Sequence, residues 1–133
     1  MPVLAPSIDL VVVRAFVTRA GHVLLVRRSA WDTLPGRWEL PGGKVDADES
    51  PELALSRELR EETALRVAAQ PALRCEAVLR SPSGRRVLER VYAVPVEGRV
   101  ALSGEHVDLV WHDLSAALPA PLTPAAHHAL RYR

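Results

Sequence analysis

The sequence contains a single cysteine, Cys75, among its 133 residues. An intramolecular disulfide is therefore excluded, and one thiol cannot build a zinc site. We expect Cys75 to be a small buried hydrophobe rather than a nucleophile. No apolar run approaches the roughly 20 residues that a membrane span needs. The chain also does not open with a basic region followed by an apolar core, so we expect a cytoplasmic protein without a membrane partner.

Charge of one sign is not in excess either. The 17 Lys and Arg residues against 16 Asp and Glu residues leave a formal charge of +1. This balance gives no reason to expect binding to a nucleic-acid polymer or to a membrane surface. A length of 133 residues suits one domain with a core of its own. No repeat or low-complexity linker divides the chain, and we assign residues 1–133 to a single domain.

Runs rich in β-branched residues predict the strands. The first covers Leu10–Thr18 and the second Val23–Arg27, and the turn Ala20-Gly21-His22 between them predicts a hairpin. The later predicted strands are Trp38–Leu40, Arg66–Leu79 with a break near Pro71, Val87–Val96 and Val107–Trp111. A C-terminal helix is predicted to begin at Thr123-Pro124, because threonine suits the N-cap and proline the first helical position.

The most informative stretch is Gly43–Leu65, where Ser50-Pro51 predicts the start of a helix that runs to about Thr63. Three carboxylates on this helix, Glu58, Glu61 and Glu62, fall within an arc of roughly 100°. Like charges at this spacing destabilise a helix by a few tenths of a kcal/mol per pair. A divalent cation would compensate, since Mg²⁺ selects hard oxygen ligands. The alternative is an ordinary solvated acidic face.

The residues around this helix favour a binding site. Leu55 and Leu59 lie four apart and form a buried seam beside the acidic arc. Upstream, Pro41-Gly42-Gly43 lets the backbone turn tightly and brings a bare carbonyl close to a ligand. Arg57 lies off the acidic face but can turn back toward the loop that carries Glu49. These are the parts of a metal–diphosphate site.

The stretch resembles the Nudix box, whose pattern is G-x5-E-x7-R-E-U-x-E-E-x-G-U with U a bulky aliphatic residue. Gly43 is followed by Glu49, then by Arg57-Glu58-Leu59-Arg60-Glu61-Glu62, and Leu65 closes the pattern. The one departure is Ala64, where the family has glycine. This position ends the helix, where a left-handed residue is often needed. Alanine there either bears strain of about 1 kcal/mol or ends the helix differently.

The resemblance implies an α+β fold, the Nudix αβα sandwich with a mixed β-sheet. It also implies hydrolysis of a nucleoside diphosphate linked to a group X, with Mg²⁺ or Mn²⁺ as cofactor. By the same resemblance, Glu58, Glu61 and Glu62 bind metal together with the carbonyl of Gly43, and Glu61 is also a candidate base. Arg57 belongs to the catalytic set, because it holds Glu49 and orients the carboxylates.

Residues outside the box complete the predicted site. The end of the second strand borders the substrate cleft in this family, so Arg28 is the first substrate-binding candidate and Arg27 the second. Glu105 resembles a loop glutamate that binds an extra metal or deprotonates water in some members, and Asp108 is its substitute. Trp31 either stacks on a base or covers the edge of the core, and we favour the core.

Substrate identity stays open in the sequence. A nucleoside triphosphate, cleaved to a nucleoside monophosphate and pyrophosphate, fits a small chain best, and ADP-ribose or another dinucleotide-type substrate is the alternative. The region Leu118–Pro124 has no asparagine of the kind that reads guanine in MutT-like enzymes. A non-catalytic nucleotide-binding domain is a further alternative, disfavoured by the intact carboxylates. The sequence does not decide the oligomeric state, and a homodimer remains an option.

Overall fold

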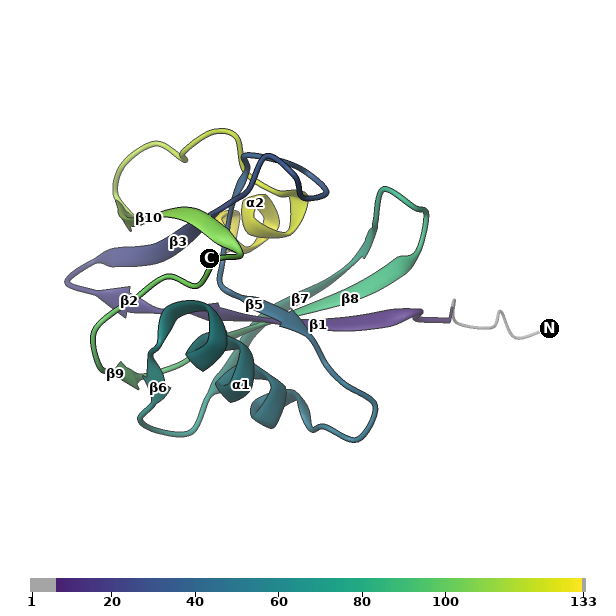
Figure 1. Cartoon of the computed structure of the whole chain (residues 1–133), viewed down its shortest axis with the longest axis horizontal. Coiled ribbons are helices and arrows are strands. Elements are labelled where there is room, and N and C mark those ends of the chain that lie inside the picture. The colour runs from purple at the N-terminus through teal and green to yellow at the C-terminus, as the bar shows by residue number, and fades with distance from the viewer. Residues whose placement is uncertain (1–6, 133) are drawn as a thin grey trace.

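The computed structural model describes residues 7–132 (Figure 1). Its elements, in chain order, are β1 (Leu10–Phe16), β2 (Thr18–Arg19), β3 (His22–Arg28), β4 (Trp38–Glu39), β5 (Gly42–Lys44), α1 (Pro51–Thr63), β6 (Arg66–Val67), β7 (Ala72–Arg80), β8 (Arg86–Ala93), β9 (Val96–Glu97), β10 (His106–Asp113) and α2 (Pro124–Arg131).

The largest sheet has the strand order β5-β1-β8-β7 and is mixed. β1 runs parallel to β8, whereas β5 and β7 pair antiparallel to their neighbours. The register places Arg14 of β1 opposite Gly42 of β5, so this strand pair brings the predicted Pro-Gly-Gly turn onto the sheet. A second sheet has the order β10-β3-β2, with β4 paired to β3, and β6 pairs with β9.

The predicted hairpin between Leu10–Thr18 and Val23–Arg27 forms only beside its turn, where Thr18 pairs with Val23. β1 ends at Phe16 and pairs with β5 and β8, and only the short β2 pairs with β3. Val17 between them is fully buried, so the chain passes through the core as it moves from one sheet to the other. The tight turn itself is present, because Ala20 and Gly21 both have positive φ, at 50° and 78°.

Helix α1 has the predicted bounds. The Ser50 side chain accepts a hydrogen bond from the backbone N–H of Leu53 at 3.2 Å, which caps the first turn. At the other end Ala64 is left-handed, with φ 63° and ψ 5°, and its N–H donates to the carbonyl of Arg60. The helix therefore ends as a glycine-terminated one would, with the strain of a left-handed alanine, about 1 kcal/mol or more.

The two helices cover opposite faces of the β-layer, as Figure 1 shows. Leu55 and Leu59 of α1 pack with Val13 in one core cluster, whose other buried members include Val17, Leu24, Leu65 and Tyr92. Leu130 of α2 packs in a second cluster with Phe16, Cys75 and Val91. This layering confirms the predicted αβα sandwich, and Cys75 is buried as expected. Within residues 7–132, no helix is both long and apolar enough to cross a membrane.

Candidate active site

The acidic face of α1 meets the turn at β5 through two close contacts. Glu62 is buried, and its carboxylate accepts a hydrogen bond from the backbone N–H of Gly42 at 2.8 Å. Glu58 lies against Gly43, where a Cβ atom would stand 2.6 Å from both carboxylate oxygens. Only glycine leaves room for Glu58 here. The Pro-Gly-Gly turn and the helix are thus fitted to each other residue by residue.

Arg57 connects the helix to the loop before it. Its Nε and Nη2 atoms donate to Glu49 at 2.6 and 2.8 Å, so the predicted contact is present. Arg57 also orients the carboxylates as predicted, because its Nη1 donates to Glu58 at 3.0 Å and to Glu61 at 3.3 Å. Nη2 also reaches the carbonyl of Lys44 at 3.1 Å. One guanidinium therefore orients two of the three carboxylates.

Burial changes the acidity of this face. It raises the pKa of Glu62 to about 7, although the Gly42 N–H and the nearby His106 and Arg14 favour the charged form. Burial also raises the pKa of Glu58, against the opposing effect of Arg57. The hydrogen bonds from Arg57 lower the pKa of Glu49 to about 2. A positive charge that binds beside Glu62 would therefore lower its pKa and favour the ionised carboxylate.

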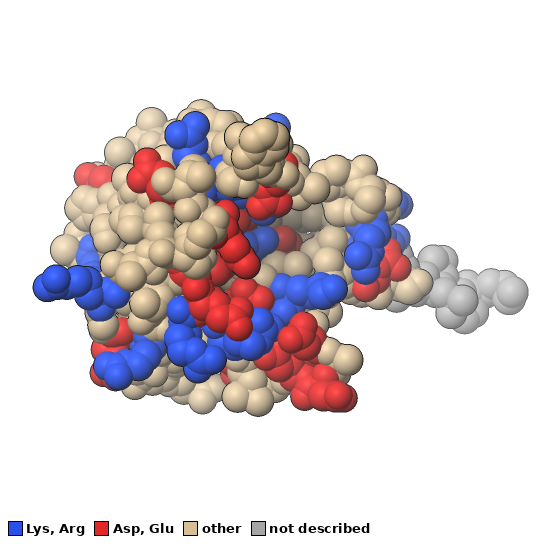
Figure 2. All heavy atoms as spheres, viewed as in Figure 1, with Lys and Arg blue, Asp and Glu red and all other residues tan. Residues whose placement is uncertain are grey.

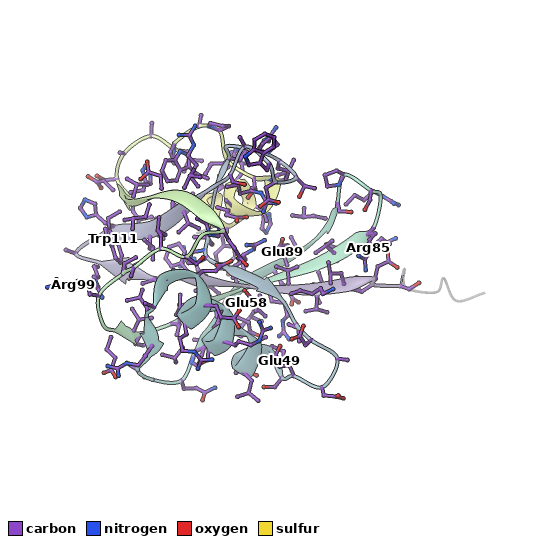
Figure 3. All side chains as sticks on the ribbon, in the orientation of Figure 1. Glu49, Glu58, Arg85, Glu89, Arg99 and Trp111 are labelled. Atoms are coloured by element: carbon purple, nitrogen blue, oxygen red, sulfur yellow. The ribbon has the colours of Figure 1, made fainter. Side chains whose placement is uncertain are left out.

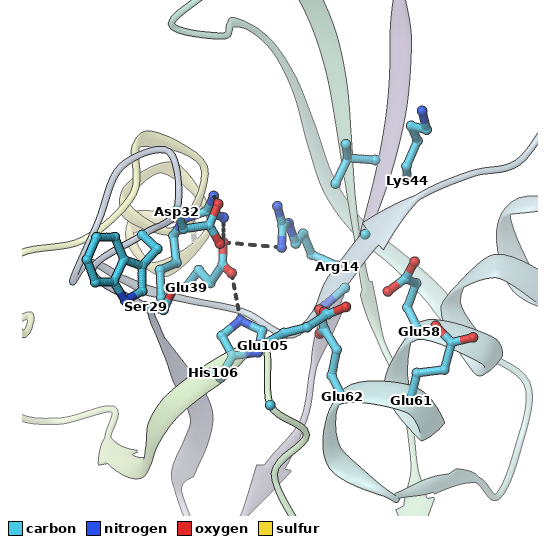
Figure 4. A pocket seen from close by; sticks show the side chains of 16 residues that line it. Arg14, Ser29, Asp32, Glu39, Lys44, Glu58, Glu61, Glu62, Glu105 and His106 are labelled. Carbon is cyan, nitrogen blue, oxygen red and sulfur yellow. Dashed lines mark hydrogen bonds and ion pairs between the residues drawn. The ribbon is translucent and has the colours of Figure 1, made fainter.

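The carboxylates line a cavity of about 570 Å³, which we call the first cavity. It is bounded on one side by Glu58, Glu61 and Glu62 of α1 and on the other by Glu105 (Figure 4). Its other lining residues are Val12, Arg14, Arg28, Ser29, Trp31, Asp32, Glu39, Gly42, Gly43, Lys44, Gly104 and His106. Figure 2 shows acidic side chains in a band across the middle of this face, with basic side chains beside them.

A buried ionic network forms part of the wall of this cavity, and sequence reasoning missed it. Glu39 pairs with Arg28 at 3.0 Å, with His106 at 2.9 Å and with Arg14 at 3.4 Å (Figure 4). Burial opposes ionisation of Glu39, but these partners outweigh it and lower its pKa to about 2. The one signal in the sequence was Arg14 itself, a lone charge inside the apolar run Leu10–Phe16.

The other predicted substrate and base candidates separate into two groups. Arg28 and Glu105 line the first cavity, whereas Arg27 and Asp108 do not. The Arg27 Nε donates instead to the carbonyl of Gly36 at 3.1 Å. Asp108 is exposed and accepts from the N–H of Leu109.

Trp31 does not cover the core. Its side chain is 96 % exposed at the rim of the first cavity, so that prediction is wrong. The loop residues beside it, Asp32 and Thr33, are held by the Arg28 guanidinium, which leaves the indole outside the packed interior.

Comparison with known proteins decides the family. Residues 9–132 match the family model described as the NUDIX domain. The chain belongs to the Nudix family. It is 40 % identical over 114 residues to a CTP pyrophosphohydrolase of Escherichia coli K12, covering 86 % of this chain and 83 % of that protein. Such relatives support a MutT-like hydrolase that acts on pyrophosphate bonds of nucleotides.

Solved structures agree with this assignment. A MutT Nudix hydrolase from Burkholderia pseudomallei superposes with a TM-score of 0.84 at 32 % identity, over 92 % of this chain and 96 % of that one. An ADP-ribose pyrophosphatase from Streptococcus suis superposes with a TM-score of 0.70 at 27 % identity, over 91 % and 86 %. A MutT Nudix hydrolase and an ADP-ribose pyrophosphatase therefore share the fold of this chain.

The residues on the acidic face suit a divalent metal by their chemistry, since carboxylate and carbonyl oxygens are the ligands that Mg²⁺ prefers. Between residues 7 and 132, no three His, Cys, Asp or Glu side chains already stand in positions to hold an ion together. The contacts explain this arrangement: Arg57 holds Glu58 and Glu61, and Gly42 holds Glu62.

Proposed function

We propose that this Nudix hydrolase cleaves a nucleoside triphosphate to a nucleoside monophosphate and pyrophosphate, with Mg²⁺ as cofactor and Mn²⁺ as a substitute. The observation that carries the proposal is the shared lining of the first cavity. Three carboxylates of α1 and the guanidinium of Arg28 border the same space, beside a glycine fitted to one of the carboxylates. The CTP pyrophosphohydrolase of E. coli supports a triphosphate substrate.

In this proposal Glu58, Glu61, Glu62 and the Gly43 carbonyl hold the metal. When bound, it neutralises phosphate oxygens and acidifies a water molecule. Arg57 acts as a positioning residue, because it fixes two of these carboxylates and, through Glu49, the loop that precedes the helix.

In this proposal Arg28 and Glu105, on the wall of the cavity opposite α1, bind the substrate and activate the water. Arg28 lines the cavity as a cation held in place by Glu39 and Asp32, and it attracts the phosphate chain. Glu105 faces the α1 carboxylates across the cavity (Figure 4) and accepts the proton of the attacking water. Asp108 does not line this space, which makes Glu105 the better base candidate of the two.

Hydrolysis of ADP-ribose is the second candidate, favoured by the structural likeness to the S. suis ADP-ribose pyrophosphatase. We rank it below a triphosphate because the CTP pyrophosphohydrolase is more similar in sequence. The two activities release different products. A triphosphate yields pyrophosphate, whereas ADP-ribose yields two phosphomonoesters.

The test is phosphate release with and without added inorganic pyrophosphatase, from nucleoside triphosphates, oxidised dGTP and ADP-ribose, in Mg²⁺ or Mn²⁺. Product chromatography follows the ADP-ribose reaction. We expect phosphate only when pyrophosphatase is added, and loss of turnover in Glu62→Gln. The matched control is Glu52→Gln, which changes an exposed glutamate of the same helix outside the cavity. Full activity in Glu62→Gln, or no metal-dependent turnover by the wild type, would refute the proposal.

A further inference from the structure

A second cavity of about 230 Å³ lies next to the first and shares Val12, Arg14, Arg28 and Glu39 with it. Its walls are mostly apolar: Leu10 and Val12 come from β1, Leu79 from β7, Val87 from β8, Leu34 and Pro82 from loops, and Pro124 and Ala125 from the start of α2. Ligand sites are typically apolar clefts with a few placed polar groups. The first cavity is charged and would suit phosphates with a cation bound to its carboxylates, whereas the second suits a flat, largely apolar ring.

The strand register explains which side chains form the floor of the second cavity. Side chains two residues apart share one face of a strand. β1 and β8 are parallel, with Leu10 opposite Val87 and Val12 opposite Glu89. Leu10, Val12, Val87 and Glu89 therefore share one face of the sheet. Glu89 stands at the inner end of this apolar strip, beside Arg14. Figure 3 shows Glu89 and Glu58 near the middle of the molecule, with Glu89 on the sheet and Glu58 on α1.

Glu89 is buried at 9 % exposure, yet only one of its oxygens is engaged. Oε2 accepts from the Nε of Arg14 at 3.2 Å, and Oε1 makes no hydrogen bond to any described residue. Glu39 differs, because both of its oxygens have partners. Arg14 also has a spare donor: its Nη1 donates to the Leu40 carbonyl at 3.2 Å, while Nη2 has no hydrogen-bond partner among residues 7–132.

Glu89 lines the second cavity, and its free oxygen is not among the fully buried polar atoms that lack a partner, so a ligand in that cavity can reach it. We propose that Glu89, held by Arg14, accepts a hydrogen bond from the amino group of the substrate's nucleobase, which lies in the second cavity. Glu89 is then a specificity-determining residue, and the enzyme prefers a base with an amino group over its counterpart with a carbonyl group. This inference rests on the proposed function, since it assigns the nucleoside end of that substrate.

The chemistry of the pair gives the direction of the preference. An ionised carboxylate only accepts hydrogen bonds, so an amino group satisfies it and a carbonyl oxygen in the same place is repelled. The spare Nη2 donor of Arg14 can meet the acceptor next to that amino group on the base edge. A site built to bind an N–H group rejects analogues that lack it far more strongly than an apolar pocket rejects a missing methylene.

Three substrate pairs isolate the effect, because each replaces one amino group by a carbonyl: CTP and UTP, ATP and ITP, GTP and XTP. For each pair the ratio of kcat/KM values is measured in the wild type and in Glu89→Gln. This ratio does not depend on the fraction of folded enzyme. The matched control is Glu76→Gln, which removes an exposed glutamate of β7 that pairs with Arg90. The affinities of the non-hydrolysable α,β-methylene analogues are measured by calorimetry in parallel.

We expect the wild type to favour the amino member of at least one pair by about 10-fold or more, a modest value for a charged hydrogen bond. Glu89→Gln should bring that ratio to within about 3-fold, and Glu76→Gln should leave it unchanged. The pair that responds identifies the base. Equal rates within every pair, or an unchanged ratio in Glu89→Gln, overturn the inference.

The calorimetry separates this inference from the proposed function. If the wild type hydrolyses no triphosphate, the proposed function fails, and the affinity ratios of the analogues decide the inference alone. A preference in binding that Glu89→Gln abolishes would support it. Equal affinities within every pair, or no binding of any analogue, would overturn it.

Discussion

Gly43 and Glu58 occupy adjoining space so closely that a Cβ atom on Gly43 would stand 2.6 Å from both oxygens of the Glu58 carboxylate. Gly43→Ala should therefore displace Glu58 and lower kcat by about 100-fold, since a misplacement of about 1 Å can cost that much. The fold should survive, which circular dichroism would show. Gly104→Ala is the control, because an added methyl group meets nothing within 4 Å there. Wild-type kcat in Gly43→Ala would contradict the role given to Glu58.

Arg57→Lys should lower metal affinity and activity, although the positive charge at this position is kept. Lysine cannot reproduce the fork that joins Glu49, Glu58 and Glu61. Loss of such supporting contacts typically costs about 10- to 100-fold in metal affinity or activity. The measurement is kcat together with the Mg²⁺ concentration for half-maximal rate. Arg60→Lys, on the exposed side of the same helix, should behave as wild type. Equal Mg²⁺ requirements in both variants would argue against a positioning role for Arg57.

The raised pKa of Glu62 predicts a pH-dependent stability in metal-free protein. Burial raises this pKa from 4.5 to about 7, so the folded state binds the proton more tightly than the unfolded state. The resulting stability is fully present below pH 4.5 and is lost as the pH rises through 7. A change of 7 minus 4.5 pKa units corresponds to about 3 kcal/mol.

The test is urea unfolding in EDTA at pH 5 and pH 8, for the wild type and for Glu62→Gln. The free energy of unfolding should fall less in Glu62→Gln between these two pH values than in the wild type. Added Mg²⁺ should then stabilise the wild type at pH 8 more than the variant. Parallel stability profiles in the two proteins would show that Glu62 does not titrate in this range.

Ala64→Gly should stabilise the protein. A left-handed alanine costs about 1–2 kcal/mol, and the greater freedom of glycine in the unfolded chain returns part of the gain. We expect a net increase of about 0.5–1 kcal/mol in the free energy of unfolding, or about 2–4 °C in Tm. Ala54→Gly, inside the same helix, should destabilise by about 1 kcal/mol or more. A lower Tm for Ala64→Gly would mean that this residue bears no strain.

Trp31, in the loop after β3, and Trp38, at the start of β4, should differ in their effect on stability. Trp31 is 96 % exposed, so Trp31→Ala should change the free energy of unfolding by less than about 0.5 kcal/mol. Trp38 packs against the core under α2, so Trp38→Ala should cost about 2 kcal/mol or more. Chemical denaturation of the two variants under the same conditions gives both values. A similar loss in both would place Trp31 in the core after all.

Local signals explain what could be predicted from the sequence. The start and end of α1 were predictable because Ser50, Pro51 and the position of Ala64 act within one helical turn. The partner of β1 was not, because parallel pairing with β8 joins segments more than 70 residues apart. The same distance hid Glu89, which meets Arg14 only once that parallel register exists. The contact between Glu39 and His106 was hidden for the same reason, because these residues lie 67 positions apart in the sequence.

The separate walls of the two cavities bear on how this chain should be compared with its relatives. The acidic wall comes from α1 and the turn at β5, whereas the apolar wall comes mainly from β1, the β7–β8 hairpin and the start of α2. If the second cavity holds the base, substitutions in the hairpin can change the nucleotide that is chosen and leave the hydrolytic residues intact. Two Nudix proteins can then share the α1 stretch by descent and still act on different nucleotides. Likeness in substrate should therefore be judged at Leu79, Val87 and Glu89 of the β7–β8 hairpin, which line the second cavity.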